Sequence, residues 1–284
     1  MAPLKVRQRS IFRPVLNALV NMTWAERLGL IGLGVVTIIA LVAHWVTPFD
    51  PQMRVGPAYL PPGSLHWFGT DEIGRDLFSR VLLGVQVTWL PALGLVLICL
   101  VAGTLIGLIP SIVSERLDGV VQRIVDLFLV LPGTLVALAV IASLGPGLTN
   151  TMIAIGVAWW PWYARISRDE FRRIRGLPHF EAALLAGVGR LRLTFHHVLP
   201  GAFPALIVFA TVDVGNVIMT ISLLSFLGLG QPAPAPELGI MTSRALDSLS
   251  EFWWLPVLPA TAIFVICFLS NLAGDGLRAA LKGK

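Results

Sequence analysis

Residues 81–114 read VLLGVQVTWLPALGLVLICLVAGTLIGLIPSIVS and contain no Asp, Glu, Lys or Arg. A helix needs about 20 mainly apolar residues to cross the hydrocarbon core of a bilayer, so this run predicts one spanning helix near residues 87–112. Of the 284 residues in the chain, 56% are hydrophobic and only 13% are charged, which is about half the charged fraction of a soluble domain. We therefore interpret the chain as an integral membrane protein whose surface is largely solvated by lipid.

Five further apolar runs predict spans of similar length. The run at residues 28–47 follows a basic N-terminal segment and is long enough to be a retained helix rather than the core of a signal peptide. The uncharged run 127–164 is too long for one helix and contains the turn signal Leu144-Gly145-Pro146-Gly147, so we expect spans at 121–143 and 148–164. The last two are expected at 203–224 and 252–272. The sequence thus predicts an all-α membrane protein with six transmembrane helices.

The basic residues predict the orientation of these helices. If the N-terminus lies inside, 17 of the 21 Lys and Arg residues fall in inner segments, and the outer segments keep only Arg54, Arg75, Arg80 and Arg244. Since short cytoplasmic loops carry an excess of Lys and Arg, both termini are expected in the cytoplasm. The net charge of +5 is then a sign of topology, and no nucleic-acid partner is expected.

The chain lacks the common sequence patterns of active sites. It contains no G-x-x-x-x-G-K-[ST] phosphate-binding loop, no H-E-x-x-H and no G-x-S-x-G. His196 and His197 are adjacent, and adjacent side chains on a helix point about 100° apart, so we expect no metal site. Cys99 and Cys267 lie in apolar runs and are expected to pack as small apolar residues. We expect no catalytic residue, so energy for any transport must come from another subunit.

The most basic loop contains a predicted helix–turn–helix. Residues 176–200 read GLPHFEAALLAGVGRLRLTFHHVLP. Pro178 suits the first turn of a helix over 180–186, Gly187 and Gly189 can end it with positive φ, and residues 190–198 form a second helix. Pro200-Gly201 is expected to break the chain before the fifth span. An amphipathic helix lying on anionic lipid is the alternative interpretation of this loop.

Six residues of this loop resemble a known motif. Glu181-Ala182-Ala183, Gly187 and Leu199-Pro200 are similar in type, spacing and expected location to the EAA loop of ABC importer permeases. The similarity extends over nearly the whole chain, to the peptide/nickel family and its second, C-type, permease. The other matching segments are FGTDEIGRDLFSR at 68–80, WPWYAR at 160–165, SFLGLG at 225–230 and NLAGDGLR at 271–278, together with Arg123, Asp126 and Pro132.

The resemblance implies an ABC importer permease fold and a transport function in the cell (inner or plasma) membrane. The EAA residues would form a coupling loop that docks on an ATPase subunit. The partners implied are a homologous second permease, as a heterodimer, two ATPase subunits that bind ATP and Mg, and an extracytoplasmic substrate-binding protein. No cofactor would be bound by this chain. The expected cargo is a di- or oligopeptide, with nickel or another small solute as the alternative. A stand-alone secondary transporter is a third interpretation, but the sequence has neither inverted repeats nor paired broken helices.

The expected organisation follows from the spans and the resemblance. Residues 1–27 form a cytoplasmic tail, 28–48 the first transmembrane helix and 49–80 an outer loop with an amphipathic segment. Residues 81–275 form the core permease domain with five transmembrane helices and the cytoplasmic EAA loop at 176–200, and residues 276–284 form a cytoplasmic tail. Three positions depart from the family pattern: Ile221 replaces a frequent Glu, Leu238 a frequent Trp and Gly201 the usual Asn. The first two bear on the substrate, and none removes the coupling loop.

Two acidic residues fall within the spans. Asp213 lies in the middle of the fifth span, where a carboxylate costs at least about 2.5 kcal/mol on insertion scales. With Asn216 it could line the translocation pathway and bind a peptide amino group or a cation; alternatively it is a hydrogen-bonded packing acid that contacts Asn216 one turn away. Asp126 lies nearer the inner end of its span and is expected to pair with Arg123, three residues earlier.

A set of charged residues precedes the second span. Asp71, Arg75, Asp76 and Arg80 recur every four or five residues and can share one face of a helix. We expect a solvated interfacial helix capped near Thr70-Asp71. The resemblance implies instead a lid at the outer mouth that meets the binding protein.

Overall fold

The computed structural model describes residues 22–232 and 234–282, and within them it contains helices and no strand. Most of the basic N-terminal tail and Lys284 lie outside these residues. The long helices are α2 (Trp24–Val46), α3 (Leu77–Val113), α4 (Glu115–Val130), α5 (Gly133–Leu144), α6 (Leu148–Arg175), α9 (Leu199–Phe226) and α11 (Trp254–Lys282). The short elements are α7 (Pro178–Leu185), α8 (Arg190–Leu193), a π-helical turn (Thr194–Val198), α10 (Leu238–Arg244) and a 3₁₀ turn (Leu246–Ser248). The prediction of an all-α protein is confirmed.

Four helices, α2, α3, α9 and α11, are long and apolar enough to cross a membrane. A fifth candidate span is the pair α4 and α5, which is bent by 90° between Val130 and Gly133. The prediction of one continuous helix over 121–143 is therefore wrong. Pro132 explains the bend, because it disfavours the helical conformation in the preceding residue, and Leu131 is extended at φ −84° and ψ 138°.

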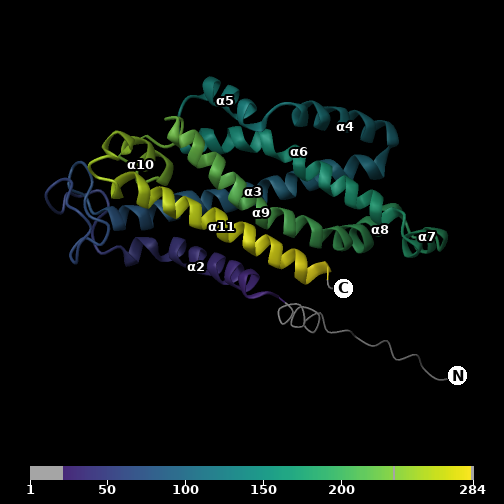
Figure 1. The fold of residues 1–284 in the computed structure, drawn as a ribbon. Coiled ribbons are helices and arrows are strands. Elements are labelled where there is room, and N and C mark those ends of the chain that lie inside the picture. The colour runs from purple at the N-terminus through teal and green to yellow at the C-terminus, as the bar shows by residue number, and fades with distance from the viewer. Residues whose placement is uncertain (1–21, 233, 283–284) are drawn as a thin grey trace.

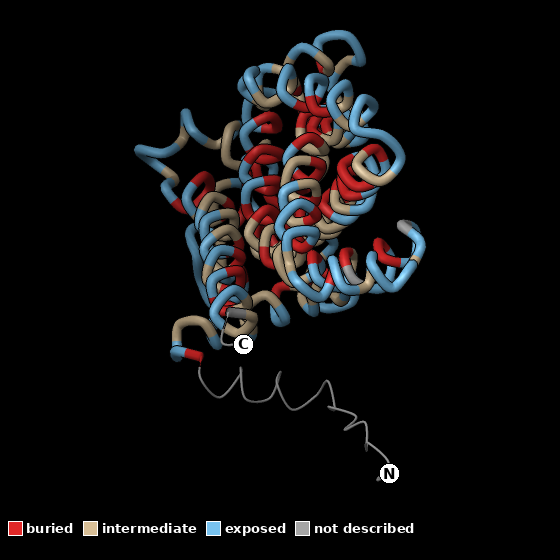
Figure 2. The backbone as a smooth tube through the Cα atoms, turned by 90° about the vertical axis from the view of Figure 1, so that its right-hand side faces the viewer, coloured by how far each residue is buried: buried red, intermediate tan, exposed pale blue. Residues whose placement is uncertain are grey.

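The long helices run side by side along one axis of the molecule (Figure 1). Residues 49–80 and α10 lie at one end, and α7, α8 and the C-terminal end of α11 lie at the other. The α4 and α5 helices lie along one side, next to α6. Viewed from the α7 end, the buried residues gather between the long helices, while their outward faces are exposed (Figure 2). This arrangement separates the segments predicted to be outer from those predicted to be inner.

Two glycines bring α3 into close contact with α6. A Cβ atom at Gly103 would lie 2.5 Å from Tyr163 Cβ, and one at Gly107 would lie 2.2 Å from the carbonyl oxygen of Ala164. Small residues four apart on one face of a helix let two backbones approach closely inside a membrane. The contact fixes α6 against α3 at the depth of Tyr163.

We expect Gly107→Val to prevent normal accumulation of the folded chain, because its side chain must displace the α6 backbone and overpacking of this kind is destabilising. The matched control is Gly94→Val on the same helix, where a Cβ atom would have nothing within 4 Å. The measurement is the yield of monodisperse protein in detergent and its thermal unfolding midpoint. Equal losses in the two variants would contradict the close contact.

Candidate functional site

The predicted helix–turn–helix forms a compact unit at one end of the molecule, which we call the knob (residues 176–198; Figure 1). Gly176 ends α6, Leu177 is extended, and Pro178 begins α7, where its missing N–H leaves no hydrogen bond unmade. Phe180 is 7% exposed and belongs to one apolar cluster with Phe171 and Ile174 of α6 and Ala202 of α9. The knob is therefore anchored to both of the long helices that flank it.

The turn that closes α7 is a Schellman motif at Gly187. Gly187 has φ +77°, its N–H donates to Leu184 O at 3.0 Å, and the Val188 N–H donates to Ala183 O at 3.1 Å. Both bonds and the left-handed glycine define this helix ending, and Ala183 and Val188 pack on the same apolar cluster. Gly189 does not share the positive φ predicted for it. The backbone hydrogen bonds of this ending and the packing of Ala183 and Val188 together hold the turn in one conformation.

The outward-facing residues of α7 are exposed in the structure. Glu181 and Ala182 are exposed, and Leu184 and Leu185 are 49% and 88% exposed. One carboxylate beside exposed leucines on a rigid support is typical of a surface that docks on another protein. The structure thus places Glu181, Ala182 and Ala183 on α7 and Gly187 in the turn that ends it, whereas Leu199 and Pro200 begin α9, just beyond the other end of the knob.

The second arm of the knob continues into α9 without the predicted break. The π-helical turn Thr194–Val198 joins α8 to α9, and the Leu199 N–H donates to Thr194 O across it. Pro200 lies in the first turn of α9, a place where helices tolerate proline. The expectation that Pro200-Gly201 separates the knob from the fifth span is therefore wrong, and the two are mechanically continuous.

Asp213 is a buried acceptor between α6 and α9. Its side chain accepts hydrogen bonds from Tyr163 Oη at 2.8 Å, from Trp159 Nε1 at 3.2 Å and from Asn216 Nδ2 at 3.5 Å. The contact with Asn216 was predicted, whereas Trp159 and Tyr163 were missed. Their only signal in the sequence is two aromatic residues with polar atoms, four apart in an uncharged span.

Asp213 and Asn216 also line an open hollow of about 540 Å³ on the surface of the helix bundle. Its walls come from the start of α5, from α6 and from α9, and Asp213 lies at its floor with only 3% exposure. None of the described Lys, Arg or His residues pairs with this carboxyl group. The other lining residues are Gly133, Thr134, Trp159, Trp162, Phe209, Met219, Thr220 and Leu223.

The acids of α4 pair across to α6 rather than along their own helix. Asp126 pairs with Arg165, so the prediction of a pair with Arg123 is wrong. Asp118 accepts from Arg168 Nε at 2.7 Å and from Ser111 Oγ at 3.0 Å. The contacts of Asp118 join the end of α3, the start of α4 and the last part of α6, and no spacing within α4 reveals either set of contacts.

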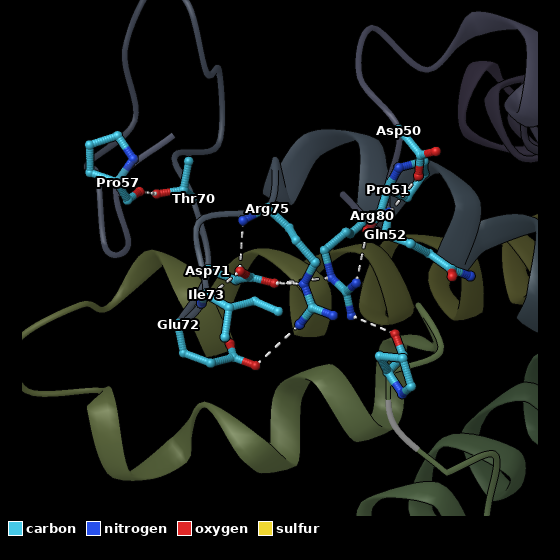
Figure 3. A network of polar contacts seen from close by, with 11 residues as sticks. Asp50, Pro51, Gln52, Pro57, Thr70, Asp71, Glu72, Ile73, Arg75 and Arg80 are labelled. Atoms are coloured by element: carbon cyan, nitrogen blue, oxygen red, sulfur yellow. Dashed lines mark hydrogen bonds and ion pairs between the residues drawn. The ribbon is translucent and has the colours of Figure 1, made fainter. Parts of the chain in front are cut away.

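The segment that contains Asp71, Arg75 and Asp76 is a buried turn, so the predicted solvated helix is wrong (Figure 3). The helix begins only at Leu77, with Asp76 as its N-cap. Gly74 has φ +84°, and a Cβ atom there would lie 2.1 Å from Gly56 O. A right-handed helix does not contain residues with positive φ. The chain therefore turns at Gly74 and packs against residues 54–60, where the Val55 N–H donates to Gly74 O at 2.8 Å.

One ionic network fills this turn. Asp71 accepts from Arg75 Nε at 2.6 Å and lies 3.4 Å from Arg80 Nε. Arg80 also donates to Pro51 O at 2.9 Å and to Pro234 O at 3.3 Å. The network therefore ties the loop 49–80 to the start of α3 and to the segment before α10 (Figure 3). His66 was missed by the sequence analysis; it bonds Asp76 at 2.8 Å through Nδ1.

Two of the family departures are buried away from the hollow. Ile221 and Leu238 are 0% exposed and belong to the main apolar cluster. Beside Leu238, the Glu237 carboxylate caps α10 by accepting from the N–H groups of Gly239 and Ile240, both at 3.0 Å. Burial raises the pKa of the Glu237 carboxyl group above its usual value. The third departure, Gly201, lies against Ile174 of α6.

Comparisons with known proteins agree with the earlier resemblance. Residues 99–283 match the family model "Binding-protein-dependent transport system inner membrane component". The chain is 39% identical over 263 residues to the di/tripeptide transport system permease protein DppC of Pseudomonas aeruginosa (strain UCBPP-PA14), covering 90% of this chain and 87% of that protein. It is 35% identical over 269 residues to the nickel transport system permease protein NikC of Escherichia coli (strain K12), covering 93% and 95%.

A solved structure with the same fold is the inward-facing MetNI methionine ABC transporter. One of its chains aligns with a TM-score of 0.60 and 19% identity, over 72% of this chain and 97% of that one. At this identity the likeness concerns the fold alone.

We expect Asp71→Asn to destabilise the outer segment by about 3–5 kcal/mol, because it leaves the buried Arg75 and Arg80 without their shared carboxylate. The control is Glu72→Gln, whose side chain is 45% exposed and whose ion pair contributes at most about 1 kcal/mol. Thermal unfolding in detergent and limited proteolysis of residues 49–80 measure the difference. Similar midpoints for both variants would contradict a buried network.

Proposed function

The chain belongs to the family of binding-protein-dependent transport system inner membrane components, which are permease subunits of ABC importers. We propose that it carries di- or oligopeptides into the cytoplasm. It is a multi-pass membrane protein, and its prediction as a peptide/nickel-type permease is confirmed. Since the relatives are subunits of larger importers, a stand-alone secondary transporter is set aside.

The observation that carries the proposal is the knob. Its exposed α7 is held rigidly by Phe180 and the Gly187 turn, and both of its arms lead directly into long helices. We propose that two partner ATPases bind ATP with Mg, and that one of them docks on Glu181, Ala182 and the neighbouring leucines. This chain then pairs with a homologous permease, and an extracytoplasmic binding protein delivers the cargo. No cofactor is assigned to this chain.

The proposed topology has six spans and both termini in the cytoplasm. In addition to the four long apolar helices and the bent α4–α5 pair, residues 148–164 of α6 carry no charge. The last turn of α6 holds Arg172, Arg173 and Arg175 next to the knob, and an excess of such residues favours the cytoplasmic side. The loop 49–80 and α10, at the opposite end, would face outward.

The hollow beside Asp213 supports a cargo with a positively charged group. The three donors to Asp213 are neutral, so an ionised carboxylate at this position has no charged partner among the described residues, and an ammonium group or a metal ion in transit would balance it. Metal transport by nickel-binding groups would favour several carboxylate or imidazole ligands, and the described residues contain no group of three or more such side chains placed to hold a metal. We therefore favour a peptide amino group over nickel, with Asp213 and Asn216 lining the pathway.

Substitutions in the knob should separate membrane insertion from transport. We expect Glu181→Lys to abolish ATP-linked uptake by reversing a docking charge, and Gly187→Val to do so because a β-branched residue is strained at φ +77°. Gly189→Ala is the control, since that glycine has ordinary φ and open space around it. Uptake into proteoliposomes and membrane yield are measured together. Normal uptake by either knob variant would contradict the assignment of the knob as the ATPase-docking surface.

The cargo is tested in a strain that lacks this gene. We expect uptake of a labelled dipeptide or a longer peptide to be lost and to return when the gene is restored, with nickel uptake unchanged. Loss of nickel uptake alone would overturn the peptide assignment while leaving the family and the knob intact.

A further inference from the structure

The two helices that lead into and out of the knob are tied together at three levels. At the end opposite the knob, Thr151 Oγ1 of α6 donates to the carbonyl oxygen of Leu229, three residues after the end of α9, at 3.0 Å. In the middle, Tyr163 and Trp159 of α6 donate to Asp213 of α9. Next to the knob, Gly201 of α9 lies so close to α6 that a Cβ atom there would be 2.9 Å from Ile174 Cδ1. Together α6, the knob and α9 form one hairpin, which we call the α6–α9 hairpin.

The middle tie lies at the same depth on both arms. Tyr163 is 12 residues before Arg175, the end of α6, and Asp213 is 14 residues after Leu199, the start of α9. At 1.5 Å per residue these separations are about 18 Å and about 21 Å. The two arms therefore cannot slide past each other without stretching the 2.8 Å bond between Tyr163 and Asp213.

The Tyr163 hydroxyl group has a fixed position. Its residue is 0% exposed, its Cβ atom faces the close contact with Gly103 of α3, and its ring meets Phe209 edge-on at 5.0 Å. Trp159 and Asn216, by contrast, contact Asp213 from the side of the hollow, which both of them line. Tyr163 is thus the donor that a passing cargo does not replace.

We infer that Tyr163 is a positioning residue that locks α6 to α9 through Asp213, so that the ATPase-driven displacement of the knob moves both helices together. This inference rests on the proposed docking of the knob to an ATPase. Without the lock, α6 and α9 stay in contact near the knob and at the opposite end but can move separately at the level of Asp213, so that the hollow between α5, α6 and α9 no longer changes in step with ATP hydrolysis. The expected defect is a loss of coupling rather than a loss of hydrolysis.

The test uses the complete transporter in proteoliposomes, with its ATPases, second permease and binding protein, and measures peptide transported per ATP hydrolysed. Tyr163→Phe removes only the hydroxyl group, and we expect this ratio to fall by about tenfold while ATP hydrolysis persists, because a hydrogen bond to a charged group is lost. The control is Tyr59→Phe, which removes the hydroxyl of the only other tyrosine in the sequence and should leave the ratio unchanged.

A double-mutant cycle shows whether the effect passes through Asp213. If it does, Tyr163→Phe combined with Asp213→Asn has a ratio no lower than that of Asp213→Asn alone, whereas multiplied losses would overturn the lock. Asp213→Asn gives the same coupling readout if Tyr163→Phe does not assemble. If the wild-type transporter works normally and Tyr163→Phe transports as much peptide per ATP as the wild type, the lock is rejected and the proposed function stands. A wild-type transporter without ATP-linked uptake rejects the proposed function, and the lock with it.

Discussion

A carboxylate in the middle of a membrane needs partners inside the protein, and Asp213 meets this constraint by joining α6 to α9. Much of the architecture serves that contact. Gly103 and Gly107 of α3 bring α6 into its place, Phe209 fixes the Tyr163 ring from the side of α9, and the open hollow begins where the packing on Asp213 ends. Both helices then lead to the knob, so the polar contact around Asp213 and the proposed docking surface belong to one hairpin.

The two ends of the molecule are stabilised by different interactions. At the end that carries residues 49–80, the buried network around Asp71 joins three segments by charge, and it includes backbone acceptors from Pro51 and Pro234. At the knob, Phe180 and the Gly187 turn provide rigidity through apolar packing and backbone hydrogen bonds. The first arrangement holds a long loop still, whereas the second leaves the outward face of α7 open for a partner.

Features with local causes could be predicted from the sequence, and features made by distant contacts could not. Pro178 and Gly187 predicted the bounds of α7 because both act on their own backbone. Pro132 also indicated a bend between α4 and α5. That bend was not predicted because the apolar run around Pro132 is long enough for one continuous spanning helix. By contrast, nothing near Asp126 indicates Arg165, and the spacing of four and five residues between Asp71, Arg75 and Arg80 suggested a helix where a turn exists. Tyr163 was missed since its partner lies 50 residues away.

The most direct test of the rigid α6–α9 hairpin is a pair of distances measured by spin labels during the ATP cycle of the complete transporter. One pair joins Ile153 near the start of α6 to Phe203 near the start of α9, and the other joins Ile153 to Ile38 on α2; all three side chains are at least 49% exposed. If the hairpin moves as one rigid body, ATP leaves the distance between Ile153 and Phe203 unchanged and shifts the distance between Ile153 and Ile38. A change within the hairpin as large as the change relative to α2 would contradict it.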